Sequence, residues 1–268
     1  MKKIPTILFA LFCSALLNAQ TSKMRLWSKA DGNDSNHAEL WYYAPKEPKG
    51  KAVIICPGGS YHHLGLKCEG VKVAEWFNSI GYAAYVLRYR VAMDGFHHPA
   101  MLEDMERALS IVRSVNDEHG VNKDSIGVIG FSAGGHLALM AGAFMPEGEK
   151  PAWVAAIYPV VSMQDSIAHR WSRKSLIGRN STQQMKDSLS MEMHLPDDMP
   201  PVYIQVSDDD KCVNPQNSIV LAEALKQKNL NYKFNHLATG GHGYGMKQNA
   251  FNATNQWWLV LEEWLKIK

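Results

Sequence analysis

The sequence has almost no net charge, few cysteines and no apolar segment long enough to cross a membrane. Its 28 basic and 26 acidic side chains leave a formal charge of +2, and Lys2 and Lys3 account for both units. A protein with so little net charge lacks the excess of basic side chains that favours binding to nucleic acid or to an anionic membrane. We therefore predict that neither is a partner of this protein.

The main apolar run, Ile4 to Leu17, follows a short basic head at the N-terminus. It falls short of the roughly 20 residues that a membrane-spanning helix needs. With the small residue Ala19, the pattern is typical of a secretory signal peptide cleaved after Ala19 or Gln20. We expect residues 1–20 to be removed and the mature protein to be periplasmic or secreted, with no membrane anchor.

The four cysteines are too few for a disulfide framework. Lipid attachment at Cys13 is disfavoured because Phe12 occupies a position that requires a small residue. Cys56, Cys68 and Cys212 remain and allow at most one disulfide. Cys56 ends an apolar run and is better explained as a small buried side chain. No cysteine and histidine spacing typical of zinc is present, so no metal is predicted.

Residues 21–268 are expected to form a single α/β domain, and 46% hydrophobic residues overall supply a substantial core. Short apolar runs bounded by glycine or proline are typical of strands covered on both faces, and therefore of a parallel sheet. These runs span residues 52–56, 83–87, 125–129, 155–158 and 202–206, and a further strand is expected at 232–237.

Helical patterns alternate with the strands, at residues 70–79, 100–116, 135–141, 215–228 and 251–267. The alternation predicts an α/β fold with right-handed crossovers and a mostly parallel, doubly wound sheet. Residues 162–201 interrupt this order. Because structureless loops of that length are rare in compact domains, we predict a small helical insertion or lid there.

A serine lies where one strand meets the following helix, in Gly130-Phe131-Ser132-Ala133-Gly134. A strand-to-helix turn this sharp crowds the backbone, so a side chain in place of either flanking glycine would collide with its neighbours. The Ser132 hydroxyl would then lie at a helix N-terminus, where unpaired amides favour developing negative charge. The pattern predicts a nucleophilic serine.

A serine nucleophile requires a base that takes its proton and an acid that orients the base. Asp210 and His242 each follow a predicted strand, and they come after Ser132 in the order expected for this chemistry. Glycines flank His242 on both sides, which suits a tight loop near a substrate better than a core. We predict Ser132, His242 and Asp210 as catalytic residues, and His136 as a packed helix residue.

Hydrolysis also requires backbone amides aimed at the developing oxyanion, each worth about 3 kcal/mol or somewhat more. The segment Pro57-Gly58-Gly59-Ser60-Tyr61 follows the strand 52–56, at the position where lipases and esterases carry a glycine-rich loop. We predict that the amides of Gly59, Ser60 and Ala133 form the oxyanion hole.

These segments, together with 207–210 and 240–243, resemble those of the α/β-hydrolase esterases that include bacterial acetyl xylan esterases and hormone-sensitive-lipase-like carboxylesterases. The resemblance runs from about Val53 to the C-terminus. This sequence differs at two positions from the HGGG-type loop of such enzymes: Pro57 replaces the histidine, and Ser60 replaces the last glycine.

The resemblance also bears on the choice of acid. In such enzymes the acid precedes a valine by three positions, and a Val-x-x-x-Asn-Ser run follows. Val213, Asn217 and Ser218 place Asp210 in that register, whereas Asp208 and Asp209 do not fit.

The resemblance implies an α/β-hydrolase fold and a serine esterase that removes small acyl groups, acetyl first among them, from plant polysaccharide or its oligosaccharides. The predicted signal peptide implies that this esterase is exported. The chemistry needs no metal or cofactor. A feruloyl esterase or a peptidase on the same fold is an alternative, and a non-catalytic carbohydrate-binding protein is a rival from another class.

Aromatic and hydrogen-bonding side chains from chain-distant segments are expected to converge above Ser132. They suit the apolar faces and hydroxyl edges of a sugar better than a long acyl chain. The candidates are Tyr61, His62, His169, Arg170, Trp171 and Tyr244. For Trp171 the alternative is a structural role, in which it anchors the insertion to the core.

Overall fold

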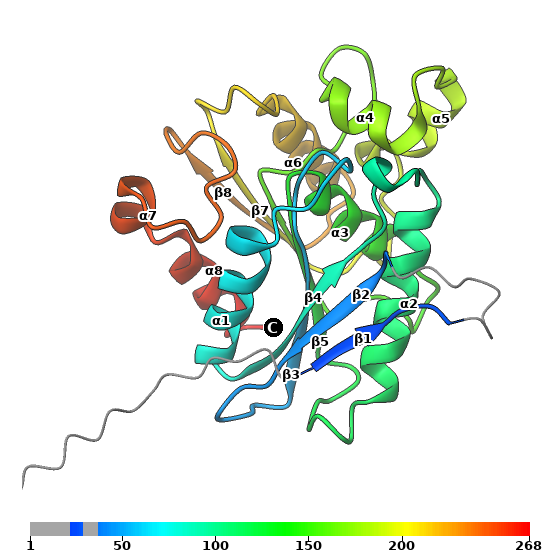
Figure 1. Cartoon of the computed structure of the whole chain (residues 1–268). Coiled ribbons are helices and arrows are strands. Elements are labelled where there is room, and N and C mark those ends of the chain that lie inside the picture. Colours follow the sequence, from blue (N-terminus) through cyan, green and yellow to red (C-terminus); the bar gives the residue numbers. More distant parts are fainter. Residues whose placement is uncertain (1–21, 29–36) are drawn as a thin grey trace, which may run out of the picture.

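The computed structural model describes residues 22–28 and 37–268, so the predicted signal peptide lies outside the described residues. The described chain forms an eight-stranded sheet in the order β1-β2-β4-β3-β5-β6-β7-β8 (Figure 1). The strands are β1 (Ser22–Arg25), β2 (Glu39–Tyr43), β3 (Lys51–Cys56), β4 (Tyr82–Arg88), β5 (Ile126–Phe131), β6 (Val154–Ile157), β7 (Val202–Ser207) and β8 (Tyr232–Leu237). Strands β3 to β8 are parallel to one another, and β2 runs antiparallel to both of its neighbours, β1 and β4.

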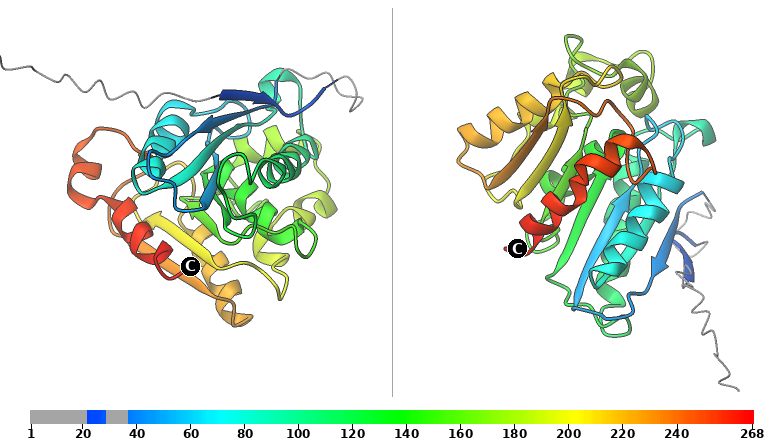
Figure 2. Two further views of the ribbon diagram at one scale, coloured as in Figure 1. Left: turned by 90° about the horizontal axis from the view of Figure 1, so that it is seen from below. Right: turned by 90° about the vertical axis from the view of Figure 1, so that its left-hand side faces the viewer.

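Helices cover both faces of the sheet, as predicted for a doubly wound fold. One face carries α2 (Ala100–Ser114), α3 (Ala133–Phe144) and α6 (Gln216–Gln227), and the other carries α1 (Lys72–Ser79) and α8 (Trp257–Leu265). The right-hand view of Figure 2 shows α1 and α8 in front of the sheet. Strands β4 and β5 lie on opposite sides of β3, so the chain crosses the sheet in opposite directions before and after β4. Because both crossovers are right-handed, α1 and α2 lie on opposite faces.

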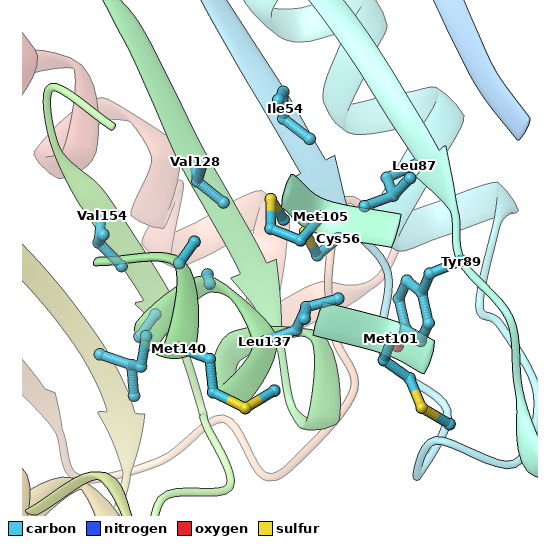
Figure 3. Close-up of a cluster of buried hydrophobic side chains, with 14 of the residues drawn as sticks. Ile54, Cys56, Leu87, Tyr89, Met101, Met105, Val128, Leu137, Met140 and Val154 are labelled. Carbon is cyan, nitrogen blue, oxygen red and sulfur yellow. The ribbon is translucent and has the colours of Figure 1, made fainter. Parts of the chain in front are cut away.

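The core follows the two-residue period of the strands. In β3, Ile54 and Cys56 face α2 and α3, whereas Val53 and Ile55 face α1 and α8. Figure 3 shows the first of these faces, where Met105 of α2 and Leu137 of α3 meet the strand side chains. Cys56 is fully buried there, which confirms its expected role as a small core residue, and it is one of three free thiols in the described chain.

Tryptophan is concentrated on the side of the sheet that α1 and α8 cover. Gly127 of β5 makes room for it, because a Cβ at this position would clash with the indole of Trp153. Trp153, Trp257 and Trp264 are buried on this side, with Trp41, Trp76 and Trp258 packed against the same cluster. The other face has only the partly buried Trp27 among the described residues.

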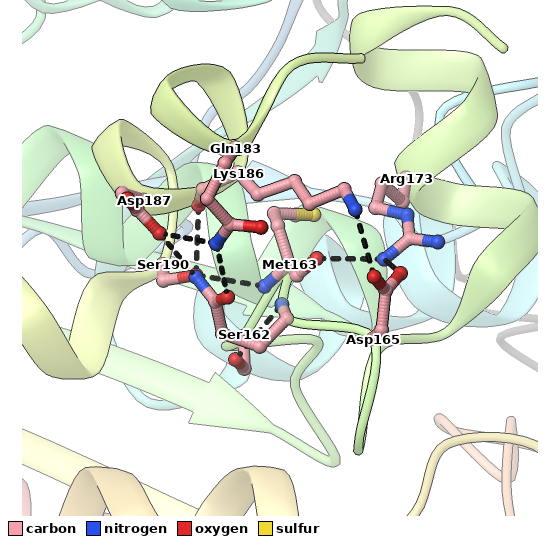
Figure 4. A network of polar contacts seen from close by, with 9 residues as sticks. Ser162, Met163, Asp165, Arg173, Gln183, Lys186, Asp187 and Ser190 are labelled. Atoms are coloured by element: carbon pink, nitrogen blue, oxygen red, sulfur yellow. Dashed lines mark hydrogen bonds and ion pairs between the residues drawn. The ribbon is translucent and has the colours of Figure 1, made fainter. Parts of the chain in front are cut away.

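The insertion between β6 and β7 is helical, as predicted. It contains α4 (Arg170–Ile177), α5 (Gln183–Ser188) and a short 3₁₀ turn, η4 (Met191–Met193). Polar contacts hold it together (Figure 4): Asp165 pairs with both Arg173 and Lys186, and the Ser190 hydroxyl accepts from the amide of Met163 at 3.0 Å. Asn217 of α6 anchors the start of the insertion, because the Asn217 Oδ1 accepts from the backbone amides of residues 161 and 162.

Two parts of the fold differ from the sequence prediction. The N-terminal strands β1 and β2, which add to the sheet beside β4, were not predicted. The last helical pattern is two helices, α7 (Ala250–Asn255) and α8, separated at Gln256, which has a left-handed φ of 39°. This break turns Trp257 into the core, where its indole N–H donates to the Gly245 carbonyl at 3.0 Å.

No helix within residues 22–28 and 37–268 combines the length and the apolar character that crossing a membrane requires.

Candidate active site

Ser132 occupies the sharp turn between β5 and α3. Its φ of 52° and ψ of −117° are strained for a residue other than glycine, as is common at functional sites. A Cβ at Gly130 would clash with the carbonyl of Gly134, and a Cβ at Gly134 would clash with the carbonyl of Cys56 in β3. The expected reason for both glycines is therefore confirmed.

Three side chains from the ends of different strands form one hydrogen-bonded chain at this turn. The His242 Nε2 lies 2.9 Å from the Ser132 Oγ, and the His242 Nδ1 lies 2.7 Å from the Asp210 Oδ2. Ser132 is 5% exposed and Asp210 is 6% exposed, so little water competes for these contacts. The geometry lets the Nδ1–H donate to Asp210 while Nε2 accepts the serine proton.

The loop after β7 fixes the orientation of the Asp210 carboxylate through the oxygen that does not contact His242. This oxygen, Oδ1, accepts from the amides of Cys212 and Val213 at 2.8 and 3.0 Å. The three-residue spacing from Asp210 to Val213 thus has a physical basis, because it lets the loop close on the carboxylate.

The two neighbouring carboxylates do not contact His242. Asp208 pairs with His236 of β8, and Asp209 accepts from the Gly241 amide at 2.7 Å. Of the three consecutive aspartates, only Asp210 contacts the histidine, in agreement with the predicted register.

The glycine-rich loop after β3 lies directly against Ser132. A Cβ at Gly58 would come within 3.1 Å of the Ser132 Cβ, and Gly59 and Ser60 have left-handed φ values of 132° and 59°. In the part of the chain that the structure describes, the amides of Gly59 and Ser60 donate to no protein acceptor. The Ala133 amide is the first of α3 and has no acceptor within that helix.

Tyr61 is not available to a substrate, contrary to the prediction. Its side chain is fully buried, and its hydroxyl is 2.8 Å from the Nδ1 of His136. The Nε2 of His136 is 2.7 Å from the Leu189 carbonyl of the insertion. His136 is thus a packed helix residue, as expected, and it links the glycine-rich loop to the insertion.

Tyr244 is likewise buried, with 2% of its surface exposed, so the prediction that it contacts substrate is also wrong. Its ring packs against those of Tyr158 and Phe251, each with a centroid separation of 4.6 Å. Sequence alone did not show this, because a tyrosine beside His242 fits a pocket wall and a core equally well.

The remaining substrate candidates do gather near the site. Trp171 is 50% exposed, and its ring lies 5.4 Å from that of His62, whose amide donates to the Gly59 carbonyl at 3.0 Å. A pocket of about 610 Å³ brings residues 165–171 of the insertion, including His169 and Arg170, together with the Asp210 loop. Burial, and then the nearby His242, lowers the pKa of His169.

A second pocket, of about 470 Å³, lies between the glycine-rich loop and the His242 loop. Its lining includes Gly59, His63, Glu69 and Gly243. Glu69 and Tyr158, which also contact these loops, were not predicted from sequence. The only sequence signal for Glu69 was the cluster of glycines at 58, 65 and 70, which indicates close packing around that segment.

The strand order, the turn at Ser132 and the placement of the three side chains define the chain as an α/β hydrolase. Solved structures share this fold. An acetyl ester-xyloside bifunctional hydrolase from Caldicellulosiruptor lactoaceticus has a TM-score of 0.85 and 30% identity, covering 94% of this chain and 98% of that one. A putative carboxylesterase from Lactobacillus plantarum has a TM-score of 0.73 and 26% identity, covering 93% and 98%.

The chain belongs to the BD-FAE family, whose model matches residues 40–225. It is also similar to an acetylxylan esterase from Xylanibacter ruminicola, with 28% identity over 263 residues. The match covers 96% of this chain but 53% of that protein, so the chain spans about half the length of this relative.

Proposed function

We propose that this protein is a serine esterase that removes acetyl groups from plant polysaccharide of the xylan type or from its oligosaccharides. The observation that carries the proposal is the hydrogen-bonded chain Ser132–His242–Asp210 at a strand-to-helix turn. The similarity to an acetylxylan esterase and to an acetyl ester-xyloside hydrolase supports acetylated carbohydrate as the substrate class.

In the proposed reaction, the Ser132 Oγ attacks the ester carbonyl carbon and its proton passes to the His242 Nε2. The amides of Ala133, Ser60 and Gly59 stabilise the resulting oxyanion. The bond to the sugar oxygen then breaks, and that oxygen takes the proton from His242. A water molecule attacks the acetyl-serine by the same route, releasing acetic acid and restoring the hydroxyl.

We assign the sugar to the side of the site formed by the insertion. The exposed ring of Trp171, with His62 beside it, offers an apolar face for stacking, and His169 and Arg170 offer polar groups at the edge of the adjoining pocket.

Labelling with a fluorophosphonate probe tests the serine chemistry, because only an activated serine reacts. We expect wild-type protein to be labelled at Ser132, and absence of labelling would contradict the proposal. A panel of acetylated xylan, methyl ferulate and a peptide amide then tests the substrate. Fastest turnover of methyl ferulate or of the amide would favour the feruloyl esterase or peptidase alternative.

We further propose that the protein is exported. The basic head and short apolar run of residues 1–20 support this. Mass spectrometry of protein from the native host is expected to find an N-terminus at Gln20 or Thr21. Recovery of the intact segment Met1 to Leu17 would contradict export by this route.

A further inference from the structure

Glu69 is a buried carboxylate between the two loops that flank Ser132. It lies in a π-helical turn, η2 (Lys67–Val71), and 8% of its surface is exposed. Both of its oxygens accept hydrogen bonds, Oε2 from the Gly58 amide at 2.9 Å and Oε1 from the Tyr158 hydroxyl at 2.7 Å. A buried carboxylate is costly unless it is bound in this way, so these contacts define its position.

The Tyr158 hydroxyl extends this contact to the loop that carries His242. It accepts from the Gly245 amide at 3.0 Å, and the Tyr158 ring lies 4.7 Å from the His242 ring. The Met246 amide also donates to the Cys68 carbonyl beside Glu69, at 2.9 Å. The Glu69 carboxylate therefore binds the glycine-rich loop directly and the loop of the predicted base through the Tyr158 hydroxyl.

The surrounding backbone is shaped to admit this side chain. A Cβ at Gly58 or at Gly65 would lie 2.7 or 3.0 Å from the Glu69 Oε2, and a Cβ at Gly245 would lie 2.9 Å from the Glu69 Cγ. Tyr158 has a left-handed φ of 38°, a strained conformation for a residue with a Cβ. The three glycines leave room for the Glu69 side chain, and the strained backbone of Tyr158 carries the hydroxyl that Glu69 binds.

We propose that Glu69 is a positioning residue for the esterase reaction, holding the oxyanion-hole amides and His242 at a fixed separation about Ser132. The inference rests on the proposed function. Since oxyanion donors act only when they are held close to the productive geometry, a shift of the loop weakens transition-state binding more than substrate binding.

The test compares Glu69→Gln with wild type. Glutamine has the same shape but one acceptor oxygen, so either the Gly58 amide or the Tyr158 hydroxyl loses its acceptor. We expect kcat for p-nitrophenyl acetate to fall about 10- to 100-fold, which is no more than the fall caused by removing one oxyanion donor. We expect KM to change about twofold or less. Affinity for an alkylboronic acid, which forms a tetrahedral adduct on the serine, falls with kcat.

Asp104→Asn is the matched control. Asp104 of α2 is also a fully buried carboxylate, and it accepts from the Arg90 guanidinium and from the indole N–H of Trp27. We expect this variant to lower Tm while kcat of the folded protein and boronic acid affinity stay at wild-type values.

A second variant, Tyr158→Phe, removes only the hydroxyl. We expect the double variant with Glu69→Gln to be no slower than the slower single variant, because both changes break one chain of contacts. Wild-type kcat and boronic acid affinity in folded Glu69→Gln would overturn the inference, as would fully additive losses. Failure of the proposed function would be distinct, since wild type itself would then lack esterase activity and phosphonate labelling.

Discussion

At the scale of single residues, the contact between Ser132 and His242 makes the sharpest prediction. We expect Ser132→Ala and His242→Ala each to lower kcat by several orders of magnitude with the fold intact, and the double variant to lose little more, because such residues act as a unit. Steady-state kinetics with p-nitrophenyl acetate and a thermal melt of each variant measure both effects. More than about a tenth of wild-type activity in either single variant would contradict the assignment.

The three consecutive aspartates provide an internal control. Asp210→Asn removes the acceptor of the His242 Nδ1–H and leaves the wrong tautomer, so we expect kcat to fall about 10⁴-fold. Asp208→Asn affects only the partly exposed pair with His236, and we expect a change of about twofold or less in kcat. Equal losses in these isosteric variants would identify a different acid.

The predicted reacting residues could be found from sequence because each follows a strand and has a distinctive local pattern. Glu69 and Tyr158 could not be found in this way. Their importance comes from contacts across the fold, with separations of 11 and 89 positions along the chain for the two hydrogen bonds of Glu69. The glycines at 58, 65 and 70 indicate close packing around Glu69, but they do not show which groups its carboxylate binds.

At the scale of elements, the helix α4 presents Trp171 to solvent beside the site. We expect Trp171→Ala to lower kcat/KM for acetylated xylo-oligosaccharide about 10-fold or more, through loss of ring stacking, and to change that for p-nitrophenyl acetate much less. Leu259→Ala, at a 46% exposed position in α8, is the control and should change neither value. Equal losses on both substrates would assign Trp171 to a structural role. In a separate comparison, faster cleavage of octanoyl than of acetyl esters by the wild type would indicate a lipase-like enzyme.

The predicted elements match where a pattern was both periodic and buried on two faces, as in β3 to β7. The N-terminal strands β1 and β2 lack this signal, because β1 is largely exposed and Glu39 and Trp41 of β2 are only partly buried. The break at Gln256 escaped prediction because the turn is favoured by the burial of Trp257, a tertiary contact, rather than by glycine or proline.

At the scale of the whole molecule, the buried His136 makes stability depend on pH. Burial lowers its pKa from the ordinary 6.5 to about 4. Between these values the unfolded chain binds more protons than the folded one, so stability is lost as pH falls from about 6.5 towards 4. Relative to His136→Gln, we expect wild type to lose about 1.4 kcal/mol of unfolding free energy per pH unit in this window.

Urea denaturation of both proteins between pH 7 and 4.5 measures this difference. The other titrating groups largely cancel in the comparison, because they are common to the two proteins. Parallel stability curves across the window would show that His136 takes up a proton equally in both states.

The gathering of tryptophans on one side of the sheet makes the intrinsic emission of this protein a directional probe. Of its eight tryptophans, six lie in or against the cluster beneath α1 and α8, and their emission will report when those helices leave the sheet. The opposite face, with α2, α3 and α6, is almost silent in this signal. Trp171 is half exposed and lies outside this cluster, so quenching of its emission by the proposed sugar substrate would report occupancy of the site separately from unfolding.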